Sequence, residues 1–222
     1  MTFKTGHRRH ADVPTLVQLD GPEATRRHEV ETFVREAFLA AYGARIGHFL
    51  PMLMTLRNDG GRLLAALGLR SPGDQQLFLE RYLDQPVEQA LGTACGQWVD
   101  RKALVEVGNF AVGSAGGGRW LITALTAYLH SAARRWAVFT CGPELRNAFR
   151  RLGVDLIDLG PADPDRLSQQ EQARWGSYYV QGPRVMAASV AQSHAVLSRL
   201  FESECALTAL WCGALQAGRL AA

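Results

Sequence analysis

The chain has 222 residues, of which 47% are hydrophobic and 20% charged, with a formal net charge of +3. These values exclude long intrinsic disorder, collagen-like sequence and a coiled-coil array, and they suit one large domain with a sizeable core. The small excess of positive charge gives no reason to expect nucleic acid as a partner.

The first part of the chain predicts a flexible arm and then an antiparallel front half. Residues 1–20 are polar and are expected to form the arm, ahead of a domain over 21–191. Apolar residues at helical spacing predict a helix from Thr25 to Gly43. Two apolar runs, 51–57 and 62–70, flank an Asn-Asp-Gly-Gly turn and predict a β-hairpin.

The second part predicts a parallel β-α-β unit. Residues 103–112 form the clearest buried strand, and a glycine-rich loop and an amphipathic helix lead from it to a second buried strand at 136–140. The other expected elements are strands at 77–80, 154–159, 175–180 and 185–190 and helices at 86–96 and 144–152. The expected fold class is α/β, with a mixed antiparallel and parallel sheet flanked by helices. A helical extension over 192–222 follows.

The cysteines and the apolar segments bear on location and partners. The four cysteines show no Cys-x-x-Cys pair and no zinc-ligand spacing with histidine, so no metal site is expected. Residues 1–20 lack the apolar run of a signal peptide. No apolar stretch reaches the roughly 20 residues that cross a bilayer. A reduced, cytoplasmic protein is expected, whose C-terminal helix contributes to the core or to a homodimer contact.

The loop Gly113–Gly118 joins a buried strand to a helix, where backbone N–H groups and the helix dipole favour an anion. Arg119 and Trp120 stand where a P-loop needs Lys and a hydroxyl residue, and the dinucleotide fingerprint lacks its third glycine. Gly116 and Gly118 match the pyrophosphate loop of GNAT-type acyltransferases, which usually carries Gln or Arg at the place of Gly113. The alternative is a flexible turn that binds no ligand.

Glu106 lies in an otherwise apolar strand. Alternation places Leu104, Gly108 and Phe110 on its face and Val105, Val107, Asn109 and Ala111 on the other. A buried carboxylate costs free energy unless it is paired or used, and burial raises its pKa toward that of a general base. The alternative is a structural salt bridge. Asn109 is expected either to orient a carbonyl or substrate amide or to make a strand-end hydrogen bond.

Four stretches, 79–84, 105–111, 151–153 and 175–179, together resemble the thermostable haemolysin family, and the resemblance spans about residues 51–188. It implies a GNAT-like branch similar to acyl-homoserine-lactone synthases. Glu106 matches the Glu of their Glu-x-x-Arg motif, and Asn109 stands in place of the Arg.

The resemblance implies acyl transfer to an amino-acid-like amine from an acyl-CoA or acyl carrier protein thioester. One alternative is cyclodehydration of N-acyl amino acids to oxazolones, for which no cofactor is essential. The other is a non-catalytic or membrane-active protein. Expected partners are an acyl or N-acyl amino acid and an acyl carrier protein or partner acyltransferase.

The expected site combines three sets of residues. Glu106, Asn109 and Tyr179 form the catalytic set, in which the phenol acts as a general acid unless it packs in the core. Arg70, Glu80 and Arg81 form the substrate-binding set, in which Arg81 either forks a carboxylate or makes a structural ion pair. The cofactor-binding set is Phe110, Ala111, Val112, Gly113, Gly116, Gly118 and Arg119.

Overall fold

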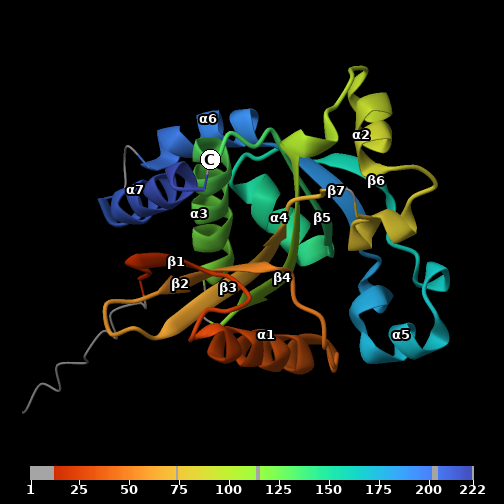
Figure 1. Ribbon diagram of the computed structural model, residues 1–222, viewed down its shortest axis with the longest axis horizontal. Coiled ribbons are helices and arrows are strands. Elements are labelled where there is room, and N and C mark those ends of the chain that lie inside the picture. The colour runs from red at the N-terminus through yellow and green to blue at the C-terminus, as the bar shows by residue number, and fades with distance from the viewer. Residues whose placement is uncertain (1–12, 74, 114–115, 202–204, 222) are drawn as a thin grey trace, which may run out of the picture.

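A mixed sheet runs through the centre of the computed structural model, which describes residues 13–73, 75–113, 116–201 and 205–221 (Figure 1). The described residues form seven strands in the order β1-β2-β3-β4-β5-β7-β6. The strands are β1 (Leu16–Asp20), β2 (Met52–Arg57), β3 (Leu63–Arg70), β4 (Leu104–Val112), β5 (Trp136–Cys141), β6 (Ile157–Pro161) and β7 (Arg184–Ser189). The β4–β5 pair is parallel and the other described pairs are antiparallel. The predicted mixed sheet and the parallel β-α-β unit are confirmed.

Helices cover both faces of the sheet, and Figure 1 shows α1 on one side and α3, α6 and α7 on the other. The α-helices are α1 (Arg27–Tyr42), α2 (Val87–Cys95), α3 (Gly117–Ser131), α4 (Pro143–Arg151), α5 (Gln169–Arg174), α6 (Val190–Phe201) and α7 (Cys205–Arg219). Short 3-10 helices are η1 (Phe78–Tyr82), η2 (Arg101–Ala103), η3 (Pro164–Arg166) and η4 (Tyr178–Gln181). In the described residues, no helix is both long and apolar enough to span a membrane.

The core has two sides because successive side chains of β4 and its neighbouring strands point to opposite faces of the sheet. Val105 and Val107 pack with α3, α4, α6 and α7 in the largest apolar cluster. Leu104 turns to the opposite face and packs with η1 and α2. Farther along the strand, Ala111 lies on that same face against α1. One face is therefore a continuous core, whereas the other carries two separate clusters with room between them.

Three predictions for the chain's local structure are wrong. Residues 16–20 pair with β2 as an edge strand rather than forming a loose arm, while 1–12 lie outside the described residues. The predicted strand at 77–80 is the 3-10 helix η1, because the Glu80 carboxylate accepts the Leu77 N–H and closes a turn. The predicted strand at 175–180 ends in η4, since Gly176 and Gly182 have positive φ, which breaks an extended run.

The helical prediction for 192–215 is confirmed as two helices, but they do not extend away from the domain. Leu210, Trp211 and Ala214 of α7 are buried in the same cluster as α3. The strand predicted at 154–159 is shifted to Ile157–Pro161. The helices predicted at 25–43, 86–96 and 144–152 and the hairpin at 51–70 are confirmed within a few residues.

Candidate active site

The central strands separate part of the way along their length. The pairing of β4 with β5 runs from Leu104 opposite Trp136 to Val107 opposite Phe139 and then stops. On the other side of β4, the register with β3 shifts between Gly68 and Ala66, so two residues of β4 face one of β3. Asn109 occupies this bulge with a φ of 51°. Beyond Val107 and Phe139, β4 and β5 are no longer paired, and they leave a gap in the sheet next to this bulge.

A cavity of about 520 Å³ fills this gap. Gly108 and Phe110 of β4 and Thr140 and Cys141 of β5 line its middle. Its two ends lie on opposite faces of the sheet. The α1 side is lined by the aromatic residues Phe38, Tyr42, Phe78, Tyr82, Trp175 and Tyr178. The α3–α4 side is lined by Leu125, Phe139, Leu145, Ala148 and Phe149.

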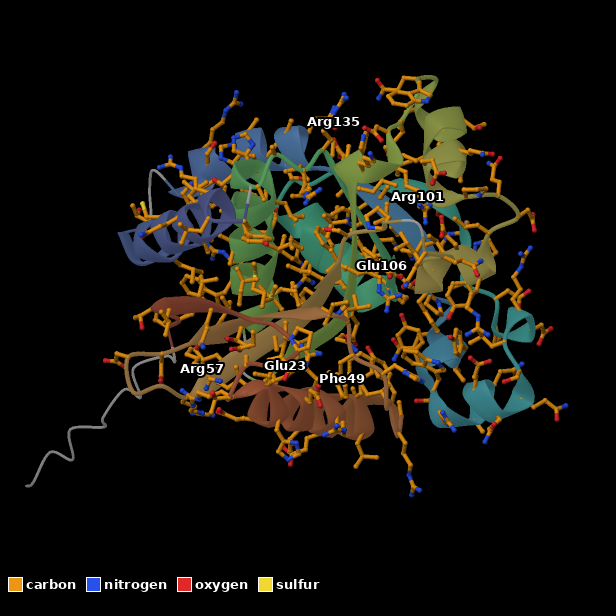
Figure 2. The ribbon with its side chains drawn as sticks, in the orientation of Figure 1. Glu23, Phe49, Arg57, Arg101, Glu106 and Arg135 are labelled. Atoms are coloured by element: carbon orange, nitrogen blue, oxygen red, sulfur yellow. The ribbon has the colours of Figure 1, made fainter. Side chains whose placement is uncertain are left out.

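Glu106 lines the cavity and is 3% exposed. Figure 2 labels its side chain among the central strands. Its Oε1 accepts a hydrogen bond of 3.0 Å from the Leu79 N–H of η1. Its Oε2 has no hydrogen-bond partner among the described residues and lies 3.7 Å from Nη1 of Arg70. Arg70 is the register partner of Glu106 on β3 and also lines the cavity. One oxygen is therefore held by the backbone and the other is left for a further donor.

The surroundings of Glu106 favour the protonated form of its carboxyl group. Burial raises its pKa above the usual value, while the Leu79 N–H and the charge of Arg70 act in the opposite direction. A raised pKa makes the carboxylate a better proton acceptor at neutral pH. The salt-bridge alternative is present only in a weak form, because the 3.7 Å separation is longer than a direct charge-assisted hydrogen bond.

Asn109 fastens a neighbouring loop to the bulge. Its Oδ1 accepts the Leu50 N–H at 2.9 Å, and its Nδ2 donates to the His48 carbonyl at 3.2 Å. The side-chain amide is therefore engaged with the 48–50 loop, and the residue lines the cavity through its place on β4. Asparagine suits this position because it adopts positive φ more readily than other residues with a side chain.

The bulge also changes which residues share a face, so part of the predicted alternation is wrong. Phe110 packs toward the α3 cluster with Val107, and Ala111 joins the α1 cluster. Strict alternation along β4 predicted the opposite faces for Phe110 and Ala111, because it did not allow for the extra residue in the bulge. Phe110, Ala111 and Val112 nevertheless all line the cavity.

The glycine loop lies only partly within the described residues, because 114–115 are outside them. Gly116 begins α3 with a φ of 84°, a conformation that favours glycine. Gly118 lines the cavity. Gly113 donates its N–H to the Leu64 carbonyl of β3. Arg119 follows in the first turn of α3, with its backbone N–H donating to the Gly116 carbonyl.

The two tyrosines of the 175–179 stretch differ in position. Tyr178 lines the cavity and stacks edge-on with Tyr42, with ring centroids 5.2 Å apart. Tyr179 packs in the α2 cluster, and its hydroxyl is 2.5 Å from the hydroxyl of Tyr82. Burial raises the pKa of Tyr179 to about 12 and also raises that of Tyr178, so both phenols are protonated at neutral pH.

Glu80 and Arg81 each form strong ion pairs within the protein. Glu80 is 6% exposed, and its oxygens accept from Leu77 N–H, Val87 N–H and both Nη atoms of Arg101. Arg81 forks the Glu171 carboxylate at 2.5 and 2.9 Å. Glu171 lines the cavity, so this pair joins η1 to α5 at the cavity wall.

Several residues of the site are missed by the sequence reasoning. Arg45 and Arg174 are exposed residues that line the cavity at its rim, and Arg45 N–H donates to the Arg174 carbonyl. Tyr42 and Phe38 come from α1, where helical spacing indicated only a buried face. The pattern Trp-Gly-x-Tyr-Tyr was the one available signal for the aromatic wall, because it formed part of the family resemblance.

Comparison with solved structures identifies the fold. An N-acyl amino acid synthase, FeeM, from uncultured soil microbes superposes with a TM-score of 0.55 at 17% identity, covering 81% of this chain and 98% of that one. The acyl-homoserine-lactone synthase LasI gives 0.53 at 14% identity, covering 82% and 93%. BjaI, a CoA-dependent acyl-homoserine lactone synthase with SAM and isopentyl-CoA, gives 0.57 at 10% identity, covering 88% and 98%. The predicted GNAT-like acyltransferase fold is confirmed.

The family follows from the sequence comparison. Residues 21–194 match the family described as thermostable hemolysin. The chain therefore belongs to the thermostable hemolysin family, as the resemblance implied. No curated protein matches the chain.

Proposed function

We propose that the protein is an N-acyltransferase that moves an acyl group from a thioester to the amine of an amino-acid-like acceptor. The observation that carries the proposal is the unpartnered Oε2 of Glu106 on the wall of a cavity that passes between β4 and β5. The structural similarity to FeeM and to LasI concerns the fold alone, and it supports acyl transfer as the class of chemistry.

In the proposed step, the acceptor nitrogen attacks the thioester carbonyl carbon and Glu106 takes the proton that the nitrogen loses. A C–N bond forms and the C–S bond breaks. The leaving thiolate then takes up a proton from the solvent, and Glu106 returns its proton to the solvent. Tyr178 is proposed to donate a hydrogen bond to that thiolate, since its ring lines the cavity and its hydroxyl is protonated. Tyr179 supports the wall through its contact with Tyr82.

The charged groups suggest how the acceptor is held. Arg70 lies beside Glu106 and is partly exposed to the cavity, so its guanidinium can pair with an acceptor carboxylate while Glu106 faces the amine. Glu80 and Arg81 are proposed to shape this end of the cavity through Arg101 and Glu171 rather than to touch the acceptor. This arrangement favours an amino acid over a simple amine.

The acyl donor is proposed to enter across the β4 bulge. The apolar end, with Leu125 and Phe149, suits a hydrocarbon chain, and the backbone from Gly108 to Val112 offers polar groups near the thioester. Gly113, Gly116, Gly118 and Arg119 are proposed to face the phosphopantetheine or another anion. The donor is acyl-CoA or an acylated carrier protein, and the cytoplasm, where such thioesters are made, is the proposed location. A homodimer contact through α7 remains part of the proposal.

The test incubates the purified protein with acyl-CoA or acylated carrier protein and an amino acid panel, and it measures both N-acyl product by mass spectrometry and thiol release. Glu106→Gln should lower the rate about 10²–10³-fold, as expected for loss of a general base. Glu36→Gln, an exposed change on α1 outside the cavity, is the matched control and should leave the rate unchanged.

Two results would overturn the proposal in favour of the alternatives. Consumption of an N-acyl amino acid without any thioester, giving a product lighter by one water, would indicate cyclodehydration to an oxazolone. Absence of turnover with every donor, or activity that Glu106→Gln leaves intact, would indicate a binding or membrane-active protein that has kept only the fold.

A further inference from the structure

Glu80 and Arg101 form a nearly saturated ion pair directly behind the proposed base. The Glu80 oxygens lie 2.5 and 3.0 Å from the Nη atoms of Arg101 and also accept the N–H groups of Leu77 and Val87. Although burial acts to raise it, Arg101 and these N–H groups hold the pKa of Glu80 below its usual value. Glu80 is therefore ionised at neutral pH, and its carboxylate ties η1 to the start of α2 and to η2.

This ion pair determines where the η1 backbone lies. Leu79, the residue before Glu80, donates its N–H to Oε1 of Glu106 at 3.0 Å. Phe78 and Leu79 both line the cavity, so η1 forms the wall against which the Glu106 carboxylate rests. Arg101 precedes β4 by a few residues, and Figure 2 shows it above Glu106 in the view. The 3-10 helix that leads into β4 therefore carries the arginine that anchors the wall.

The ion pair also sets the local charge that Glu106 experiences. The ionised carboxylate of Glu80 raises the pKa of Glu106, whereas Arg70 lowers it. Arg101 lies between Glu80 and Glu88 and contacts both, at 2.5 and 2.7 Å. The cluster of Glu80, Glu88 and Arg101 therefore has a net charge of −1, and removing one partner changes it to 0 or −2. The other titratable or charged groups on the cavity walls are Tyr42, Arg45, His48, Tyr82, Cys141, Glu144, Glu171, Arg174 and Tyr178.

We infer that Glu80 and Arg101 are positioning residues for Glu106: they hold η1 so that one carboxylate oxygen is fixed by the Leu79 N–H and the other is left without a hydrogen-bond partner, and their paired charges act on the proposed base. This inference rests on the proposed function for its catalytic meaning, but the geometry and the charge effect on Glu106 do not depend on turnover.

The test titrates the Glu106 carboxyl directly by ¹³C NMR on protein labelled at glutamate Cδ, with the Glu106→Gln spectrum giving the assignment. Glu80→Gln removes a negative charge and should lower the pKa of Glu106, because the Glu80 carboxylate raises it. Arg101→Gln removes a positive charge and should raise it by about the same amount. Arg101→Lys keeps the charge and should leave the titration close to that of the wild type.

Opposite shifts are the distinguishing result. Both neutral variants break the same ion pair and loosen η1, so a purely structural role predicts shifts of the same sign or none, and such a result would overturn the inference. Arg81→Gln is the matched control, because it breaks the other ion pair of η1 without changing the cluster beside Leu79. The same shifts should appear in the acidic limb of the pH–rate profile. Opposite NMR shifts in a protein that shows no acyl transfer would contradict the proposed function and leave the positioning role intact.

Discussion

The two ends of the cavity differ in chemistry although they belong to one opening. On the α1 side, Arg70 and Glu106 lie beside a wall of aromatic rings that contact one another. On the α3–α4 side, Leu125, Phe139 and Phe149 offer only apolar surface. The two ends meet where the β4–β5 pairing stops, so the sheet separates a polar end from an apolar end while leaving a passage between them.

This contrast explains why the proposed base, Glu106, lies where it does. A carboxylate in the apolar chamber would have no polar neighbours and would cost free energy. On the α1 side, Glu106 has the Leu79 N–H and the charge of Arg70 to stabilise it. The polar end is therefore expected to control the rate, and the apolar end is expected to select the acyl group.

Among the tests of this contrast, the largest effect is expected from filling the apolar end. Ala148→Trp places an indole where Ala148 lines the cavity. For long acyl donors, kcat/KM should fall about 100-fold, within the range that pocket shape commonly provides. Acetyl donors should be unaffected and serve as the control. An equal loss for short and long donors would contradict the division of the cavity into two ends.

A smaller effect is expected at the bulge that joins the two ends. Asn109→Ala should destabilise the protein by about 2 kcal/mol, because it removes two hydrogen bonds and leaves a strained positive φ. Asn109→Gly loses the same hydrogen bonds but relieves the backbone, so it should be about 1 kcal/mol more stable than Asn109→Ala. Urea unfolding at an unchanged m-value measures both. Equal stability of the two variants would show that the backbone is not strained.

The buried charge at the polar end should make stability depend on pH. Burial raises the pKa of Glu106 in the native state above its usual 4.5. The stability that proton binding at Glu106 contributes is therefore fully present below pH 4.5 and is lost as the pH rises through the native pKa. Glu106→Gln should therefore melt about 2–4 °C higher than the wild type at pH 8. The gain should disappear below about pH 4.5. A constant difference across this range would mean that the carboxylate is not destabilised by burial.

The smallest effect is expected for an ion pair outside the cavity. Arg184 and Asp158 join β7 to β6 at the surface, with side chains 37% and 43% exposed. Arg184→Gln should change the free energy of unfolding by less than about 0.5 kcal/mol, because solvent screens an exposed pair. Urea unfolding in low and high salt is the measurement. A loss comparable to that of Asn109→Ala would require a structural role for this edge.

The sequence predicted the parallel unit and its flanking helices because their apolar spacing is regular and local. It also identified Glu106, since a single carboxylate in an apolar strand is conspicuous. The bulge at Asn109 was missed, because positive φ at a residue other than glycine leaves no sequence pattern. The wrong strands at 77–80 and 175–180 share one cause: their conformations depend on contacts with distant residues.

Two of those distant contacts explain why neither segment forms a strand. Glu80 stabilises η1 by pairing with Arg101, which lies 21 positions away. Gly176 passes so close to the Tyr42 carbonyl that a Cβ would lie 2.1 Å from it, and Ser177 N–H donates to the same oxygen. A short run with Trp175, Tyr178 and Tyr179 predicts a strand when such partners are unknown.

The strand order has a consequence for how the chain is synthesised. Since β7 lies between β5 and β6, the earlier strand β6 has no neighbour in the sheet until residues 184–189 have left the ribosome. The turn that carries Trp175 and Tyr178 connects β6 to β7, so the aromatic wall is assembled late in translation. A nascent chain halted before β7 would contain Glu106 and the aromatic residues but would lack the strand that joins β6 to the sheet.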